Sequence, residues 1–156
     1  MSTLLQAPDG YLYGATAQAC GEVFRIAIDG TLTSLHQFAG GMNGCRVEAP
    51  LIRGSDGDFY GVTRWGGLQN RGTVFRVTSG GVVTILHRFN GADGEWPTSL
   101  IQGSDGMIHV VYTWRRKKIK YVKIDPKKLE GKEIVNGRWP EMKGYVSPTQ
   151  GEVTAD

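Results

Sequence analysis

The sequence lacks long hydrophobic runs, and its longest apolar stretches span only a few residues. A membrane helix needs about 20 mostly apolar residues, so we expect no membrane partner. Met1 to Leu4 show no basic segment followed by an apolar stretch, so we expect no signal peptide. Proline is scarce, at 6 residues, whereas glycine is abundant, at 23 of 156. Abundant glycine with little proline excludes a collagen-like chain and indicates many tight turns.

Lysine is absent from residues 1–106, which carry seven arginines against nine acids, a net charge of −2. Residues 107–156 carry eleven bases against six acids, a net charge of +5. The total of +3 is too small to indicate a polyanionic partner by itself. This contrast fits either a domain boundary or related repeats with different histories, and the periodicity favours repeats.

Three segments of the chain resemble one another. Asp-Gly pairs stand at 9, 56 and 105, with spacings of 47 and 49 residues. Gly21–Ile26 resembles Gly72–Val77, and Leu35–Phe38 resembles Leu86–Phe89, both at an offset of 51. Self-similarity at such a period indicates stacked supersecondary units.

Each unit contains four short segments rich in β-branched and aromatic residues, bounded by Gly, Asp or Asn. In the second unit these are the Leu-Ile pair at 51, Asp58–Thr63, Thr73–Thr78 and Val82–Phe89. Four strands in about 50 residues, repeated, are typical of a β-propeller blade. We therefore predict an all-β fold of about three blades, each made of four antiparallel strands. The expected units are 1–50, 51–99 and a partial blade at 100–129, followed by a polar tail at 130–156.

Two family resemblances follow from these motifs. Residues 1–100 resemble the GloVer-type tandem repeats of bacterial cell-surface and secreted proteins, through Gly54–Gly61 and Gly72–Arg76. Residues 97–129 resemble the last blade of sialidase-like, BNR-type propellers, through Pro97–Gln102, Ile108–Val122 and Ile124–Leu129. The first resemblance implies an extracellular or cell-surface location, and the second implies a protein that binds or cleaves glycans.

The resemblance to sialidases also suggests what is missing. Trp96 stands where many relatives carry the tyrosine nucleophile, and an indole cannot attack an anomeric carbon. We expect a glycan-binding module or a non-catalytic fragment, with no sialidase turnover by this chain alone. One alternative is a structural or protein-interaction repeat without chemistry. Another is a hydrolase that is active only when the full propeller is assembled.

Three blades are too few to close a propeller, which usually has four to eight. They would leave a wide wedge of unpaired surface. The chain is therefore expected to be a fragment, an open stack, or a self-associating propeller. A dimer of three-blade halves would contain six blades and two head-to-tail seams.

The loops between the second and third strands are expected at 17–21, 64–72 and 115–118, and those between blades at Ala39–Pro50 and Asn90–Pro97. All should share the face opposite the Asp-Gly turns, where propellers build their sites. Tryptophan offers a flat face to a sugar ring, and arginine offers a two-pronged donor to a carboxylate. An acidic glycan is the expected ligand, although the tryptophans could instead pack between blades. The candidate ligand residues are Arg64, Trp65, Trp96, Tyr112, Trp114, Arg115 and Arg116.

The basic run 115–118 has three interpretations: a solvated turn tip, a contact for an anionic glycan, or a nucleic-acid contact. The last is the weakest, so we expect no nucleic-acid partner. His36 and His87 occupy equivalent positions in different units, which indicates packing or a repeated hydrogen bond instead of a metal site. We expect no metal and no cofactor. Cys20 and Cys45 could form a disulfide or remain two thiols.

Overall fold

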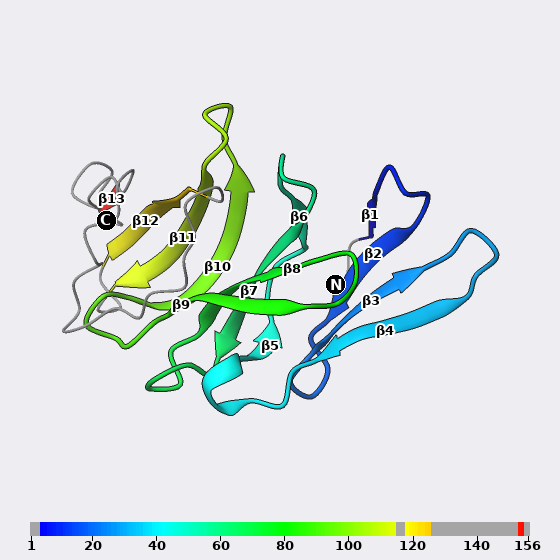
Figure 1. Cartoon of the computed structure of the whole chain (residues 1–156). Coiled ribbons are helices and arrows are strands. Elements are labelled where there is room, and N and C mark those ends of the chain that lie inside the picture. Colours follow the sequence, from blue (N-terminus) through cyan, green and yellow to red (C-terminus); the bar gives the residue numbers. More distant parts are fainter. Residues whose placement is uncertain (1–3, 115–117, 126–152, 155–156) are drawn as a thin grey trace.

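The computed structural model describes residues 4–114, 118–125 and 153–154. Antiparallel strands form three sheets, which lie side by side in chain order from the N-terminus to the C-terminus (Figure 1). Among the described residues, the only helical element is a short 3-10 turn, η1 (Gly41–Asn43). These findings confirm the predicted all-β fold and the partial propeller of about three blades.

Blade 1 is the four-stranded sheet β1 (Leu5–Gln6), β2 (Leu12–Thr16), β3 (Glu22–Ile26) and β4 (Leu32–Gln37). Blade 2 has five strands: β5 (Cys45–Val47), β6 (Ile52–Arg53), β7 (Phe59–Trp65), β8 (Thr73–Val77) and β9 (Val83–Arg88). Blade 3 contains β10 (Glu95–Gln102), β11 (Ile108–Trp114), β12 (Lys118–Ile124) and β13 (Val153–Thr154). Consecutive strands of a blade pair with one another, except that β5 and β6 both pair with β7.

The Asp-Gly pairs at 9, 56 and 105 form the turns between β1 and β2, between β6 and β7, and between β10 and β11. Gly10, Gly57 and Gly106 have φ values of 87°, 91° and 76°, a conformation that glycine adopts without steric cost. The preceding aspartate accepts the backbone N–H two residues further on in every blade. This bond closes an Asx turn, which explains the Asp-Gly pair that marks each repeat.

The hydrophobic core lies between the blades. Tyr13 and Val23 of blade 1 pack with Phe59 and Phe75 of blade 2 in one cluster. A second cluster joins Tyr60 and Val62 of blade 2 to Ile108, Val110 and Tyr112 of blade 3. Each inner blade surface is therefore covered by the next blade, and this burial holds the stack together.

Two glycines at equivalent positions allow close contacts within the blades. Gly61 of β7 lies under the ring of Phe75, where a Cβ atom would be 2.3 Å from Cζ. Gly14 lies in the same way under Phe24, at 2.6 Å. The two pairs occupy matching registers, Gly14 opposite Phe24 and Gly61 opposite Phe75. Any side chain at these glycines would displace the aromatic ring from the sheet.

The predicted loops between blades are shorter than expected. We predicted irregular connections at Ala39–Pro50 and Asn90–Pro97, but β5 and the start of β10 lie within them. The prediction is wrong over those residues because a three-residue strand shows no alternation that a pattern can detect. Of the predicted polar tail, residues 130–152 and 155–156 lie outside the described residues, and Val153–Thr154 pair with β12 as β13.

The two histidines singled out in the repeats pack against aromatic rings. His36 contacts Phe38 edge-on at 4.7 Å between ring centroids, and His87 contacts Phe89 in the same way at 4.4 Å. His87 is buried, and its Nε2 lies 3.2 Å from Oδ2 of the buried Asp93. Burial lowers the pKa of His87 below its usual value, and this effect outweighs the attraction of Asp93.

The buried histidine predicts acid-labile stability. The folded state holds His87 with a lowered pKa, so below about pH 6.5 the unfolded chain binds more protons than the folded one. The free energy of unfolding should have its full value above about pH 6.5 and should decrease as the pH falls. His87 should contribute at most about 1.4 kcal/mol of this decrease per pH unit. Urea unfolding at pH 7.5 and 5.5 measures the decline. His87→Gln should reduce it, and an unchanged decline in this variant would assign the acid sensitivity to other groups.

Candidate functional site

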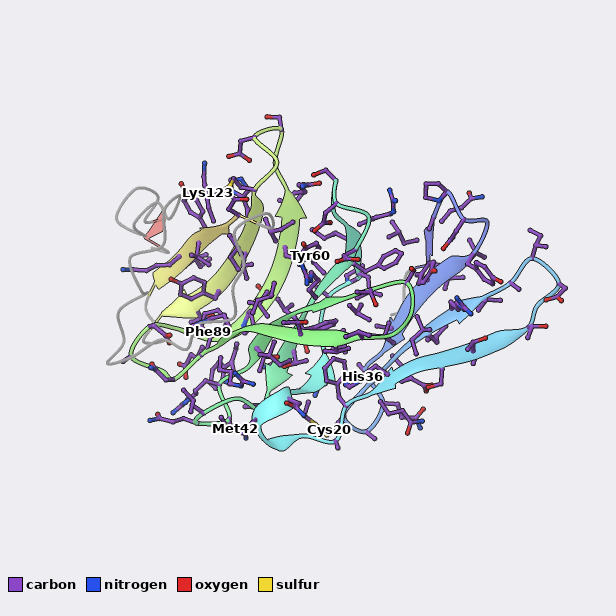
Figure 2. The ribbon with its side chains drawn as sticks, viewed as in Figure 1. Cys20, His36, Met42, Tyr60, Phe89 and Lys123 are labelled. Atoms are coloured by element: carbon purple, nitrogen blue, oxygen red, sulfur yellow. A yellow bond between two sulfur atoms is a disulfide. The ribbon has the colours of Figure 1, made fainter. Side chains whose placement is uncertain are left out.

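The loops between β2 and β3, between β7 and β8, and between successive blades lie along one edge of the molecule, at the bottom of Figure 1. The Asp-Gly turns lie along the opposite edge. Cys20 and Met42 mark the loop edge in Figure 2, and Lys123 lies near the turn edge. The predicted separation of these loops from the Asp-Gly turns is thus present in the structure.

Three of the predicted ligand residues meet at the loop edge. Arg64 and Trp65 are the last two residues of β7, and Trp96 is the second residue of β10. The two indoles meet edge-on at 5.7 Å between ring centroids. The guanidinium of Arg64 lies 5.5 Å from the Trp65 ring and 5.9 Å from the Trp96 ring. All three side chains are partly exposed, and they come from strands instead of the predicted loops.

Glu48, which sequence reasoning missed, holds Arg64 in place. Its Oε1 lies 3.2 Å from NH1 of Arg64, and its Oε2 lies 3.4 Å from Nε of Arg46. One carboxylate therefore serves two guanidinium groups, which leaves the group with a net positive charge. We call Arg46, Glu48, Arg64, Trp65 and Trp96 the rim cluster.

The two junctions between blades are built alike at this edge. Arg46 and Trp96 both have positive φ, at 64° and 53°, and each donates its backbone N–H to the loop of the preceding blade. The acceptors are the carbonyl oxygens of Cys20 and Arg71. This conformation is strained for residues other than glycine, and its recurrence shows that it belongs to the repeat architecture.

Side chains reinforce each junction by different chemistry. Cys20 and Cys45 form a disulfide between blades 1 and 2. At the corresponding positions between blades 2 and 3, Arg71 forms an ion pair with the buried Glu95. The structure thus decides between the two states left open for the cysteines. Their spacing of 25 residues carries no signal for pairing, because the contact depends on how two blades meet.

The other predicted ligand residues do not join the rim cluster in the described part of the chain. Tyr112 is buried in the core, where its ring packs against Phe89 at 5.0 Å between centroids. Burial raises the pKa of its hydroxyl to about 12. The backbone of Trp114 ends β11, but its side chain lies outside the described residues, as do Arg115 and Arg116.

The turn edge carries a second repeated set of polar side chains. Tyr13 and Tyr60 donate their hydroxyls to Asp9 and Asp56, at 2.7 and 2.5 Å. Each tyrosine is opposite an arginine of the next strand, Arg25 or Arg76. The signal for this set is a tyrosine four residues after the Asp-Gly aspartate, which sequence reasoning did not use. Because both tyrosines are fully buried, the hydrogen bonds satisfy hydroxyls that folding removes from water.

Blade 3 modifies this set by replacing tyrosine and arginine. His109 and Lys123 occupy the equivalent registers, and both contact Asp105, at 3.3 and 3.1 Å. The backbone N–H of Met107, followed by Lys123 and His109, lowers the pKa of Asp105 to about 2. In blade 3 a partly exposed histidine thus takes the place of a fully buried tyrosine.

Within residues 4–114, 118–125 and 153–154, no three His, Cys, Asp or Glu side chains are grouped as a metal site would need. No helix in the same part of the chain is long and apolar enough to cross a membrane.

Stacked antiparallel blades of four or five strands, a core between them and repeated junctions define a β-propeller repeat protein. The model of the Gloeobacter/Verrucomicrobia repeat matches residues 1–116, so the chain belongs to that repeat family. The match confirms the repeat resemblance and extends it beyond residue 100. It also includes the first part of residues 97–129. The resemblance of that segment to sialidase-type propellers is not supported by any similar family or structure found. No curated protein sequence matches the chain.

Among solved structures, the chain is similar to an X-ray structure of a protein assigned as a gluconolactonase, with a TM-score of 0.53. The two chains share 16% identity, and the match covers 76% of this chain. The likeness therefore shows the propeller fold alone. The chain spans only 43% of that propeller chain.

Proposed function

We propose that this repeat module is a non-catalytic binding protein whose rim cluster receives an acidic glycan. The observation that carries the proposal is the meeting of two partly exposed indoles and a guanidinium at 5.5 to 5.9 Å, contributed by two different blades. Indole faces take sugar rings, and a guanidinium takes a carboxylate with two parallel hydrogen bonds.

The charges around the cluster support an anionic ligand over a neutral one. Glu48 contacts both Arg46 and Arg64, so it can stay paired with Arg46 while Arg64 turns to a ligand carboxylate. The Arg64 side chain is 36% exposed, which leaves part of its guanidinium accessible. The disulfide at the same edge fits an oxidising compartment, where extracellular glycans occur.

The proposal predicts weaker glycan binding after loss of rim residues. Stacking on one indole and one charge-assisted hydrogen bond each contribute on the order of 1–3 kcal/mol. Trp65→Ala with Arg64→Gln should therefore weaken binding at least tenfold. Binding is measured by titration with sialic acid and uronic oligosaccharides. Tryptophan fluorescence detects binding to the wild type, and calorimetry detects binding to the variants.

Arg53→Gln is the matched control, because it removes the same charge from β6, beside the Asp-Gly turn of blade 2. It should leave the affinity unchanged. Equal weakening by both variants would indicate a general charge effect, and equal affinity of the rim variant and wild type would refute the rim site.

A structural repeat without a ligand is the second candidate function. It is favoured by the ion pairs Arg64–Glu48 and Arg71–Glu95, which occupy the charged groups of the loop edge within the protein. Under this alternative the rim variants lose folding stability, and no acidic oligosaccharide binds the wild type at millimolar concentration.

A further inference from the structure

Every blade has two faces, defined by the neighbour that each one meets. The leading face points toward the following blade, and the trailing face points toward the preceding one. In blade 2 the leading face includes Tyr60, Val62 and Val74, which pack on blade 3. Its trailing face includes Leu51, Phe59 and Phe75, which pack on blade 1. Alternation along the strands assigns neighbouring residues to opposite faces.

The leading face of blade 3 is open in this chain. Register places His109, Val111 and Tyr121 at the positions of Tyr60, Val62 and Val74. The three residues of blade 2 are fully buried, whereas their counterparts are partly exposed. Ile101, opposite His109, is 64% exposed, although its counterpart Ile52 packs against the core. These residues line a hollow of about 410 Å³, together with Ile119, which is 45% exposed.

The trailing face of blade 1 is open in a complementary way. Leu4 precedes β1 as Leu51 precedes β6, and the exposed fractions of these leucines are 45% and 3%. Leu32, opposite Ile26, has the same register as Val83, which is opposite Val77. Leu32 is 59% exposed, whereas Val83 packs against the core. Phe24 lies between them at the position of Phe75. The face therefore repeats the apolar pattern that blade 2 presents to blade 1.

The charges of the two end blades are opposite in sign. Residues 1–50 contain four acids and two arginines, a net charge of −2. Residues 100–129 contain eight bases and two acids, a net charge of +6. Apposition of these end blades would be attractive, whereas apposition of two third blades would bring like charges together.

We propose that the leading face of blade 3 binds the trailing face of blade 1 in a second copy of this chain. The contact reproduces between copies the packing that joins the blades within one copy. It is heterologous, so two copies close into a ring when each supplies both faces. Two copies give six blades, within the usual range for a closed propeller. The inference does not depend on the glycan proposal, because it uses other residues.

The size of the solved propeller agrees with this arrangement. One copy spans 43% of the gluconolactonase-type chain, so a second copy would complete a propeller of similar extent. His109 would then lie against Leu12 of the partner copy, since Leu12 has the register of Phe59 and Ile108. This pairing would cover the hollow that Ile101 and Ile119 now leave open.

Sedimentation equilibrium of the purified full chain, from micromolar to millimolar concentration, tests the contact. The wild type should be dimeric at the upper end. Ile101→Asp with Ile119→Asp should remove the leading contact, and Leu4→Asp with Leu32→Asp should remove the trailing one. Each double variant should dissociate with a constant at least tenfold larger than that of the wild type. All four residues are exposed, so the variants should fold, which a circular dichroism melt verifies.

Ile28→Asp with Val82→Asp is the matched control. These residues are 95% and 65% exposed, they lie at the β3–β4 and β8–β9 turns, and neither is among the residues of the two faces named above. This control should associate like the wild type. If it dissociates equally, the association is unspecific and the proposal is wrong.

Mixing the two face variants distinguishes head-to-tail contact from other dimers. The variant substituted on the leading face keeps an intact trailing face, and the variant substituted on the trailing face keeps an intact leading face. Each should therefore be monomeric alone, and the mixture should form one-to-one dimers through a single seam. A wild type that stays monomeric at millimolar concentration would overturn the proposal, as would a dimer that survives in only one of the two variants.

Discussion

Removal of the disulfide should destabilise the protein by about 3 kcal/mol. Cys20 and Cys45 close a loop of 25 residues, and a cross-link of this length restricts the unfolded chain by about that free energy. The bond also joins the β2–β3 loop to β5, so its loss weakens the junction between blades 1 and 2. We expect Cys20→Ser with Cys45→Ser to lower the midpoint of urea unfolding without changing the fold, as measured by circular dichroism.

Reduction of the wild type provides the internal control. A reducing agent should bring the wild-type midpoint close to that of the double variant and should leave the variant unchanged. A wild type that is insensitive to reduction would show that the disulfide does not support the fold. The junction between blades 2 and 3 depends on Arg71 and Glu95 instead, so it should not respond to the reducing agent.

The blade architecture was predictable from the sequence because its signals are local. Asp9, Asp56 and Asp105 mark turns whose geometry depends on the next glycine and on one hydrogen bond to the backbone. The strands that follow alternate between two packed faces, so their composition identifies them. β5 escaped prediction because it has three residues, and it becomes a strand only by pairing with β7.

The candidate site was predictable only in part. Arg64, Trp65 and Trp96 meet as expected because strand ends and loops of neighbouring blades share one edge. Glu48 and Arg46 were missed because their contacts depend on the left-handed residue at the start of the second blade. Tyr112 was predicted to be a ligand residue, but strand alternation turns it toward blade 2.

The largest effect should follow from Phe75→Ala, which removes a fully buried ring from the centre of the core. Phe75 covers Gly61 and contacts Phe38 of blade 1 at 4.9 Å between centroids. Truncation of such a ring leaves a cavity that the flanking sheets cannot fill. We expect a loss of about 4 kcal/mol in the free energy of unfolding, measured by urea unfolding of the variant at neutral pH.

Phe24→Ala is the matched comparison, because Phe24 covers Gly14 in blade 1 as Phe75 covers Gly61 in blade 2. No preceding blade lies against Phe24 among the described residues of this chain, so its removal opens a groove to solvent instead of a closed cavity. We expect a loss of about 2 kcal/mol in dilute, monomeric protein. Equal costs for the two variants in dilute solution would contradict the idea that burial between blades sets the difference. If a second copy covers blade 1, the cost of Phe24→Ala should rise toward that of Phe75→Ala as the protein concentration increases, because the ring then becomes enclosed on both sides.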